Sequence, residues 1–206
     1  MIIGLTGMYC AGKNHIAALL QKQGFPVLDI DTLGHGVIES KKQEIIARFG
    51  NDIQKTDNTV DRRRLGAKVF GKKDELAALE AIIHPEVNRL TMQWIETRNA
   101  EHCVLNAAVL HKSAVFEKLD RIILVSAPRL IRLIRAKKRD KLPWTVLMKR
   151  LSSQKQFSTQ YLAGNADIYR VENCCLSETE TEQRIDAILT EAGLIFYRDE
   201  TTQGGF

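Results

Sequence analysis

The sequence predicts an α/β fold built on a doubly wound, five-stranded parallel sheet. Three observations point to it: five short apolar runs have the length and β-branched content of buried strands, segments of helical period separate them, and a glycine-rich turn directly follows the first run. Strands that alternate with helices pair in parallel, because each crossover lays a helix back over the sheet. We therefore expect helices on both faces of the sheet.

The predicted strands cover residues 1–6, 26–30, 102–109, 121–127 and 166–171. Apolar residues three and four positions apart predict helices after the first, fourth and fifth of these strands, over residues 15–23, 129–139 and 180–192.

The stretch between the second and third strands is much longer than one crossover requires. It is expected to form several helices, including residues 74–83 and 85–98. The end of the chain is polar and rich in glycine, and we expect it to be mobile. The predicted organisation is a core of residues 1–31 and 102–194, a helical insertion of residues 32–101 and a polar tail of residues 195–206.

Composition places the chain among ordinary globular proteins. Of its 206 residues, 44% are hydrophobic and 27% are charged, which excludes a collagen-like or wholly disordered chain. A net charge of +5 admits nucleic acid, an anionic membrane or a phosphorylated metabolite as a partner. No run approaches 18 apolar residues and no secretory signal is evident, so we expect a cytoplasmic protein. No C-x-x-C pair occurs, and reduced thiols are expected at Cys10, Cys103, Cys174 and Cys175.

The glycine-rich turn carries the strongest motif. Gly7, Gly12 and Lys13 fit G-x-x-x-x-G-K between an apolar strand and a helical segment, which is the context that a P-loop requires. Backbone N–H groups of such a loop curl around a phosphate, and the lysine reaches the transferring phosphoryl group. The pattern predicts a fold of the P-loop NTPase type. The alternative is a plain glycine turn with an exposed lysine.

The residue after the P-loop lysine is unusual. Asn14 stands where Ser or Thr normally offers a hydroxyl to Mg²⁺. Because an amide oxygen also ligates Mg²⁺, we expect Asn14 to hold the metal directly or through a water molecule.

Two carboxylates, Asp29 and Asp31, end the second predicted strand. Ligands of open α/β sheets bind at this carboxyl edge. A carboxylate there can accept the proton of an acceptor hydroxyl or hold a water molecule on Mg²⁺. For Asp29, capping of the next helix is an equally weighted alternative.

The positive charge of the chain is concentrated in one segment. Residues 129–150 carry a net charge of +8, so the other 184 residues sum to −3. Such a segment after the fourth strand predicts a basic helical lid that closes over a triphosphate. The alternatives are a solvated helix face and a nucleic-acid groove. The segment has few aromatic residues between its charges, which argues against the groove. The basic residues are Arg129, Arg132, Arg135, Lys137, Lys138, Arg139, Lys141, Lys149 and Arg150, and they face a single acid, Asp140.

Longer motifs resemble those of the dephospho-coenzyme A kinase family, from Ile2 to about Leu194. The nucleotide-binding parts that are similar to the family's read GLTGMYCAGKNHIA, VLDID, RAKKRD, KRLSSQ and NADIYRVEN. The discriminating parts read ARFG, VDRRRLGAKVF and LEAIIHPEV, and they resemble its acceptor-domain signature.

The resemblance implies transfer of the γ-phosphoryl group of ATP, with Mg²⁺, to the ribose 3′-hydroxyl of dephospho-coenzyme A. It implies a lid at about residues 128–158 and an acceptor-binding role for the insertion. The catalytic residues that it implies are Asp31 as base or hydroxyl-orienting carboxylate, Lys13 and the lid residue Arg139. The nucleotide would contact Gly7, Tyr9, Cys10, Ala11, Gly12, Lys13, Asn14, His15, Arg135 and Asn173. The acceptor would contact Asp31, Arg62 and His84, with a purely structural His84 as the alternative.

The sequence departs from the family pattern after the third strand. Where the family usually has Pro-Leu-Leu-x-Glu, this chain runs from Ala108 to Lys112 and lacks both the proline and the acid. Three other functions stay open beside the implied one: another P-loop kinase of nucleosides or metabolites, a nucleotide-binding homologue without transfer, and a nucleic-acid binder. The favoured partner is a small-molecule substrate, without nucleic acid or membrane. The oligomeric state stays open.

Overall fold

A computed structural model describes residues 1–98, 102–154, 161, 166–174 and 178–193. Five strands form one sheet in the order β2-β3-β1-β4-β5. Every pairing is parallel, which confirms the predicted five-stranded α/β sheet. The strands are β1 (Ile2–Gly7), β2 (Val27–Asp29), β3 (Cys103–Asn106), β4 (Arg121–Ser126) and β5 (Asp167–Glu172).

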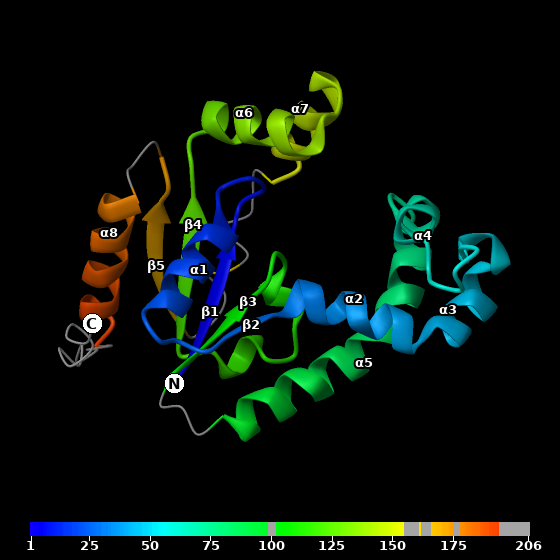
Figure 1. The fold of residues 1–206 in the computed structure, drawn as a ribbon, viewed down its shortest axis with the longest axis horizontal. Coiled ribbons are helices and arrows are strands. Elements are labelled where there is room, and N and C mark those ends of the chain that lie inside the picture. The colour runs from blue at the N-terminus through cyan, green and yellow to red at the C-terminus, as the bar shows by residue number, and fades with distance from the viewer. Residues whose placement is uncertain (99–101, 155–160, 162–165, 175–177, 194–206) are drawn as a thin grey trace, which may run out of the picture.

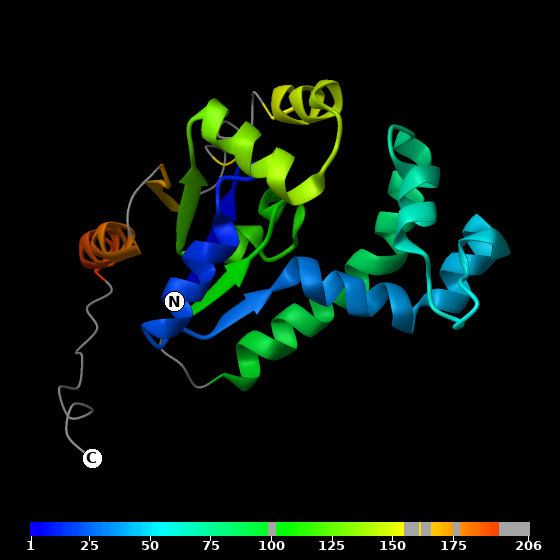
Figure 2. The same cartoon turned by 45° about the horizontal axis from the view of Figure 1, so that its top comes forward.

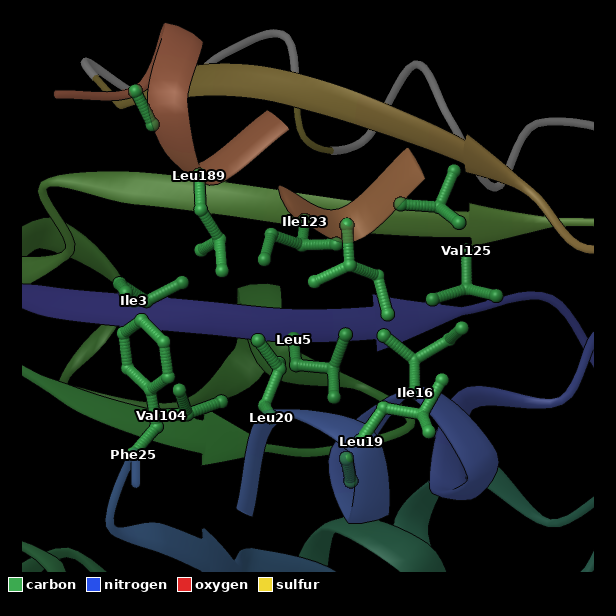
Figure 3. Close-up of a cluster of buried hydrophobic side chains, with 14 of the residues drawn as sticks. Ile3, Leu5, Ile16, Leu19, Leu20, Phe25, Val104, Ile123, Val125 and Leu189 are labelled. Atoms are coloured by element: carbon green, nitrogen blue, oxygen red, sulfur yellow. The ribbon is translucent and has the colours of Figure 1, made fainter. Parts of the chain in front are cut away.

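Helices cover both faces of this sheet. On one face, α1 (Lys13–Lys22) and α8 (Glu178–Glu191) pack against the central strands. Figure 3 shows this layer, with labelled side chains from β1, β3, β4 and both helices: Ile3, Leu5, Ile16, Leu19, Leu20, Val104, Ile123, Val125 and Leu189. The opposite face carries a second cluster, which includes Leu105, Ile122 and Leu124. Side chains therefore alternate between the two layers along each strand, as a doubly wound sheet requires.

The second strand is shorter than predicted, and Asp31 does not lie in an extended strand end. β2 stops at Asp29, whose side chain accepts a hydrogen bond from the Thr32 N–H at 2.8 Å and caps α2 (Ile30–Ser40). The helix therefore begins before residue 32, and Asp31 lies in its first turn. Asp29 therefore caps the next helix, as the alternative interpretation of this residue predicted. β3 also ends early, at Asn106 rather than at residue 109.

The insertion consists of helices with a small core of their own. α2 is followed by α3 (Lys42–Phe49), α4 (Arg62–Val69) and α5 (Lys73–Thr97). The prediction of separate helices at 74–83 and 85–98 is wrong, because α5 continues through Pro85. Proline removes one helical hydrogen bond, yet apolar residues on both sides of it, Leu79 and Val87, are buried and hold the two halves. Figures 1 and 2 show these helices projecting from one side of the sheet.

Two basic helices form the remaining segment. α6 (Arg129–Asp140) and α7 (Trp144–Ser152) follow β4, and Figure 1 places them beyond the carboxyl ends of the strands. The last residues of the predicted lid, 155–158, and the tail, 195–206, lie outside the described residues. Within the described part of the chain, no helix is long and apolar enough to cross a membrane.

Candidate active site

Two neighbouring cavities open at the carboxyl edge of the sheet, and Asp31 lines both of them. The first, of about 820 Å³, is called the P-loop cavity here; the second, of about 380 Å³, lies against α2 and α5 and is called the insertion cavity. The P-loop cavity brings together most of the predicted nucleotide residues. They are Gly7, Tyr9, Cys10, Gly12, Lys13, Asn14, His15 and Arg135, and the predicted lid residue Arg139 lines the cavity with them.

The P-loop is braced from α6 and from the end of β5. The Ala11 carbonyl accepts hydrogen bonds from Asn173 Nδ2 at 2.9 Å and from Arg135 Nη1 at 3.2 Å. Arg135 also donates to the Asn173 carbonyl at 3.1 Å. Gly12 has a φ of +96°, and a Cβ atom there would overlap with Asn173 Nδ2. Glycine is therefore required at residue 12 both by backbone conformation and by space.

Asp31 is held from two sides. Lys13 Nζ lies 2.9 Å from Asp31 Oδ2, and the Ala108 N–H donates to both carboxylate oxygens, at 3.1 and 3.2 Å. The Lys13 side chain is 11% exposed, whereas that of Asp31 is 45% exposed. Because proline has no N–H, Ala108 supplies a donor that a proline at this position, as in the pattern that the sequence resembles, would lack. The carboxylate is oriented while one side of it stays open to both cavities.

A buried amide lies below this pair. Asn106 Nδ2 donates to Asp29 Oδ2 at 3.1 Å and approaches Asn14 Oδ1 at 3.4 Å. The strand register explains the meeting, because Asn106 lies beside Asp29 across the β2-β3 pair. Asn14 reaches the same place from the first turn of α1.

An ionic cluster ties the basic helices to the P-loop. Asp140 accepts hydrogen bonds from Arg139 Nε at 2.7 Å, from Arg150 Nη1 at 3.4 Å and from the Tyr9 hydroxyl. The two guanidinium groups lie over the Tyr9 ring, at 5.1 and 5.9 Å from its centroid, and Gln154 Oε1 accepts the Tyr9 N–H at 2.7 Å. The Arg139 guanidinium holds the pKa of Asp140 below its usual value, despite some desolvation. Burial and the Asp140 hydrogen bond raise the pKa of Tyr9.

A family model described as dephospho-CoA kinase matches residues 1–187 of the chain. The chain belongs to the dephospho-CoA kinase family. A Treponema pallidum dephospho-CoA kinase is 32% identical over 94% of this chain and 96% of its own length. A Shouchella clausii dephospho-CoA kinase is 32% identical over 93% of this chain and 99% of its own length.

Solved structures share the fold of this chain. A Thermus thermophilus crystal structure is 31% identical and superposes with a TM-score of 0.78, covering 93% of this chain and 97% of that one. A shikimate kinase from Bacteroides thetaiotaomicron is 14% identical, with a TM-score of 0.57 over 94% of this chain and 99% of that one, and shows a shared fold alone. As a dephospho-CoA kinase family member, the chain uses ATP as a substrate and acts on a small molecule.

Besides Asp31, the two other acceptor residues predicted from the kinase resemblance lie in different places. His84 lines the insertion cavity together with Asp31. Arg62 begins α4 and lines neither cavity. The Lys112 side chain lies outside the described part of the structure.

Sequence reasoning missed several polar groups of this kinase site. Ala108 stands out in the sequence only as a lost proline, because a backbone N–H has no residue signature. Asn106 carries a usable signal: it is the polar residue that ends a buried strand, as Asp29 does. Lys138, which the sequence assigns to the basic lid without a specific role, also lines the P-loop cavity, beside Arg135 and Arg139.

The family implies a divalent metal ion, and the residues below Lys13 fit one. The described residues contain no group of three His, Cys, Asp or Glu side chains placed to hold a metal. Oxygen atoms are nevertheless gathered there, on Asn14 and Asp29, and the buried Asn106 Oδ1 has no hydrogen-bond partner among the described residues. Amide and carboxylate oxygens are the donors that a hard cation prefers, with phosphate oxygens supplying further ligands.

The predicted reduced thiols are confirmed where the structure describes them. Cys10, Cys103 and Cys174 are free, and Cys175 lies outside the described residues. Cys10 lines the P-loop cavity with a φ of +59°, and burial raises the pKa of its thiol. Burial therefore disfavours the thiolate form of Cys10.

Proposed function

We propose that this chain transfers the γ-phosphoryl group of ATP to the ribose 3′-hydroxyl of dephospho-coenzyme A. The observation that carries the proposal is the position of Asp31, whose carboxylate lines both the P-loop cavity and the insertion cavity. A group that faces a phosphoryl donor on one side and an acceptor on the other can accept the proton of the attacking hydroxyl. Ala108 N–H and Lys13 keep the carboxylate directed into that junction.

The P-loop side holds the phosphates. Backbone N–H groups around Gly12 and the N-terminal end of α1 offer donors to the β- and γ-phosphates. Lys13 leaves Asp31 to pair with the transferring group, and Arg139 supplies positive charge from the lid. With Lys13 withdrawn, the carboxylate of Asp31 is free to take the proton.

The insertion side binds the acceptor. Ile30, Ile83 and Val87 give the cavity apolar walls, while His84 and Asn88 add polar groups. Such a lining suits a long ligand with a polar end directed at Asp31. Arg62 lies on the insertion outside this cavity, and we propose that it contacts a part of the acceptor remote from the reacting hydroxyl.

The divalent cation of the reaction is proposed to be Mg²⁺. Mg²⁺ held there would supply positive charge that neutralises the charge developing on the transferred group. Asn14 and Asp29 would hold it, directly or through water. Mg²⁺ usually keeps several water molecules and takes few protein ligands, which agrees with this small donor set.

The basic helices favour a small-molecule partner over nucleic acid. Arg135, Lys138 and Arg139 line the P-loop cavity, and Arg139 and Arg150 are engaged by Asp140. Charge directed into a cavity serves a phosphorylated ligand, whereas nucleic acid needs charge spread along an open surface.

The proposal is tested by ADP formation from ATP and Mg²⁺ with a panel of acceptors. We expect turnover with dephospho-coenzyme A and background rates with adenosine, other nucleosides and shikimate. Mass spectrometry should show one added phosphate on the acceptor. Folded protein that forms ADP equally fast with and without dephospho-coenzyme A would contradict the proposal, and turnover with another acceptor would favour a different P-loop kinase.

A further inference from the structure

Tyr161 is the largest fully buried side chain among the residues that the structure describes. It follows α7 in the chain and belongs to the core layer that also contains Leu110. Its ring meets the rings of His111 and Phe116 edge-on, with centroids 5.3 and 6.0 Å away. A phenylalanine would fill this place in the core equally well. The hydroxyl therefore needs an explanation of its own, because a hydroxyl is costly to bury unless it is hydrogen-bonded.

The Tyr161 hydroxyl is bonded to the turn that follows β3. It lies 3.1 Å from Thr6 Oγ1 on β1 and 3.3 Å from His111 Nδ1. Burial raises the pKa of Tyr161, and hydrogen bonds with Thr6 and with the backbone of Leu110 and His111 offset part of that rise. Both of these turn residues belong to a short 3₁₀ helix, η2 (Leu110–Lys112). One oxygen atom thus ties η2 to the central strand of the sheet.

The same turn holds the Asp31 carboxylate. Ala108 lies between β3 and η2, and its N–H donates to both oxygens of Asp31, at 3.1 and 3.2 Å. Its carbonyl lies 3.5 Å from Thr6 Oγ1, the atom that also meets the Tyr161 hydroxyl. Ala108 is therefore in contact with the carboxylate on one side and with the partner of Tyr161 on the other.

This chain needs such contacts because residue 108 is not a proline. In the family pattern that the sequence resembles, a proline ring would fix the backbone φ angle at this position. Ala108 has no ring, so its surroundings must set the conformation of the turn. Leu110 anchors the turn by packing, since it is completely buried. The Tyr161 hydroxyl supplies a directional anchor, because hydrogen bonds depend on angle as well as on distance.

We propose that Tyr161 is a positioning residue for phosphoryl transfer, whose hydroxyl fixes the turn after β3 so that the Ala108 N–H directs the Asp31 carboxylate. Tyr161 lines neither the P-loop cavity nor the insertion cavity, so it acts through Ala108 and not on the substrates. This inference rests on the proposed role of Asp31 as the proton acceptor. It adds a residue that lies 130 positions further along the chain.

The first test is the kcat of Tyr161→Phe, which removes the hydroxyl and keeps the ring. With saturating ATP, Mg²⁺ and dephospho-coenzyme A, we expect kcat to fall by about tenfold, because a small misplacement of a reacting group costs up to roughly 100-fold. The ATP Kd should be unchanged, since the P-loop contacts are kept. Tyr169→Phe is the matched control: Tyr169 is half-buried on β5, packs against the other core layer, and should keep the wild-type kcat.

A double mutant separates positioning from a general loss of packing. In an Asp31→Asn background, the amide cannot accept the proton however well it is placed. Tyr161→Phe should therefore lower the residual kcat no further in that background. A residue that merely supports the fold would instead lower kcat by the same factor in both backgrounds.

Amide hydrogen exchange reports on the turn without any turnover. In the ligand-free protein, we expect the Ala108 N–H to exchange several times faster in Tyr161→Phe than in the wild type, because the turn opens more often. Exchange at Ala108 should be unchanged in Tyr169→Phe. Nuclear magnetic resonance resolves this single amide.

Three results would each overturn the inference: a wild-type kcat in Tyr161→Phe, an equal loss of kcat in both backgrounds, or unchanged exchange at Ala108. If Tyr161→Phe does not fold, His111→Phe removes the Nδ1 partner, keeps a ring at the contact and undergoes the same three measurements. The proposed function fails separately, when the wild type shows no acceptor-dependent ADP formation or when Asp31→Asn keeps its kcat. An Asp31→Asn protein that loses its kcat beside a fully active Tyr161→Phe protein removes this inference alone.

Discussion

At the scale of residues, the site depends on a few atoms whose roles follow from their immediate contacts. Lys13 and Asp31 are found from sequence because motif and strand-end position mark them. The donor on Ala108 and the buried amide of Asn106 are not, because the first belongs to the backbone and the second depends on which strands are neighbours. Asp29 has two roles at once, which the sequence offered only as alternatives. One carboxylate oxygen caps α2, and the other accepts a hydrogen bond from Asn106.

Gly12 provides a sharp test at this scale. Gly12→Ala forces a side chain against Asn173 at a φ of +96°, so the bracing of Ala11 by Asn173 and Arg135 is lost. We expect the ATP Kd to rise by at least about tenfold, equivalent to roughly 1.4 kcal/mol. Gly24→Ala is the matched control, since Gly24 has a φ of +92° and no atom within 4 Å of the added Cβ.

Both variants should lose roughly 1–2 kcal/mol of stability from left-handed backbone strain. Only the Gly12 variant should lose nucleotide affinity. Isothermal titration with ATP and thermal unfolding measure the two effects separately. Equal ATP affinity in both variants would show that the bracing of the P-loop does not matter for binding.

At the scale of elements, hydrophobic period predicts which segments become helices and strands, but not where they join. The apolar pattern of residues 74–83 and 85–98 is helical in both parts, and the proline between them suggests a break. Burial of Leu79 and Val87 on either side keeps α5 continuous. β2 is short because a cap, Asp29, starts the next helix at once. The local sequence does not show whether Asp29 caps the next helix or whether the strand continues by one more residue.

The lid helices carry a prediction about Asp140. Its carboxylate engages Arg150 and also Arg139, which lines the P-loop cavity. Asp140→Asn should therefore loosen α6 and α7 from Tyr9 in the ligand-free protein. Trypsin should then cut within residues 129–150 several times faster, and ATP should restore protection.

The control and the pH dependence follow from the same contacts. Asp167→Asn removes an exposed carboxylate that pairs with Arg121 on the sheet, away from the lid, and should leave cleavage of the lid unchanged. Arg139 lowers the pKa of Asp140 in the folded protein. The ion pair therefore stabilises the folded state at pH values above 3.8, the ordinary pKa of the carboxyl, and this stabilisation is lost as the pH falls through the lowered pKa. Cleavage of Asp140→Asn at the wild-type rate would contradict the role of Asp140 as a latch.

At the scale of the whole molecule, the sheet order brings three distant stretches to one edge. The P-loop after β1, the caps after β2 and the turn after β3 meet because β3 lies between β2 and β1. Alternation of strands and helices predicts the parallel sheet, and the concentration of charge in residues 129–150 predicts a basic segment near the phosphates. The pairing order itself leaves no local trace in the sequence. The contacts of Asn106 and Ala108 could therefore not be predicted from it.

The central claim is that Asp31 joins a phosphoryl-donor cavity to an acceptor cavity and takes the hydroxyl proton. It is tested most directly by kcat for Asp31→Asn in a coupled ADP assay with saturating ATP, Mg²⁺ and dephospho-coenzyme A, with Asp167→Asn as control. We predict that kcat falls by about 100-fold or more while ATP still binds, since the amide cannot accept the proton and Lys13 is freed. A folded Asp31→Asn protein with wild-type kcat would contradict the claim.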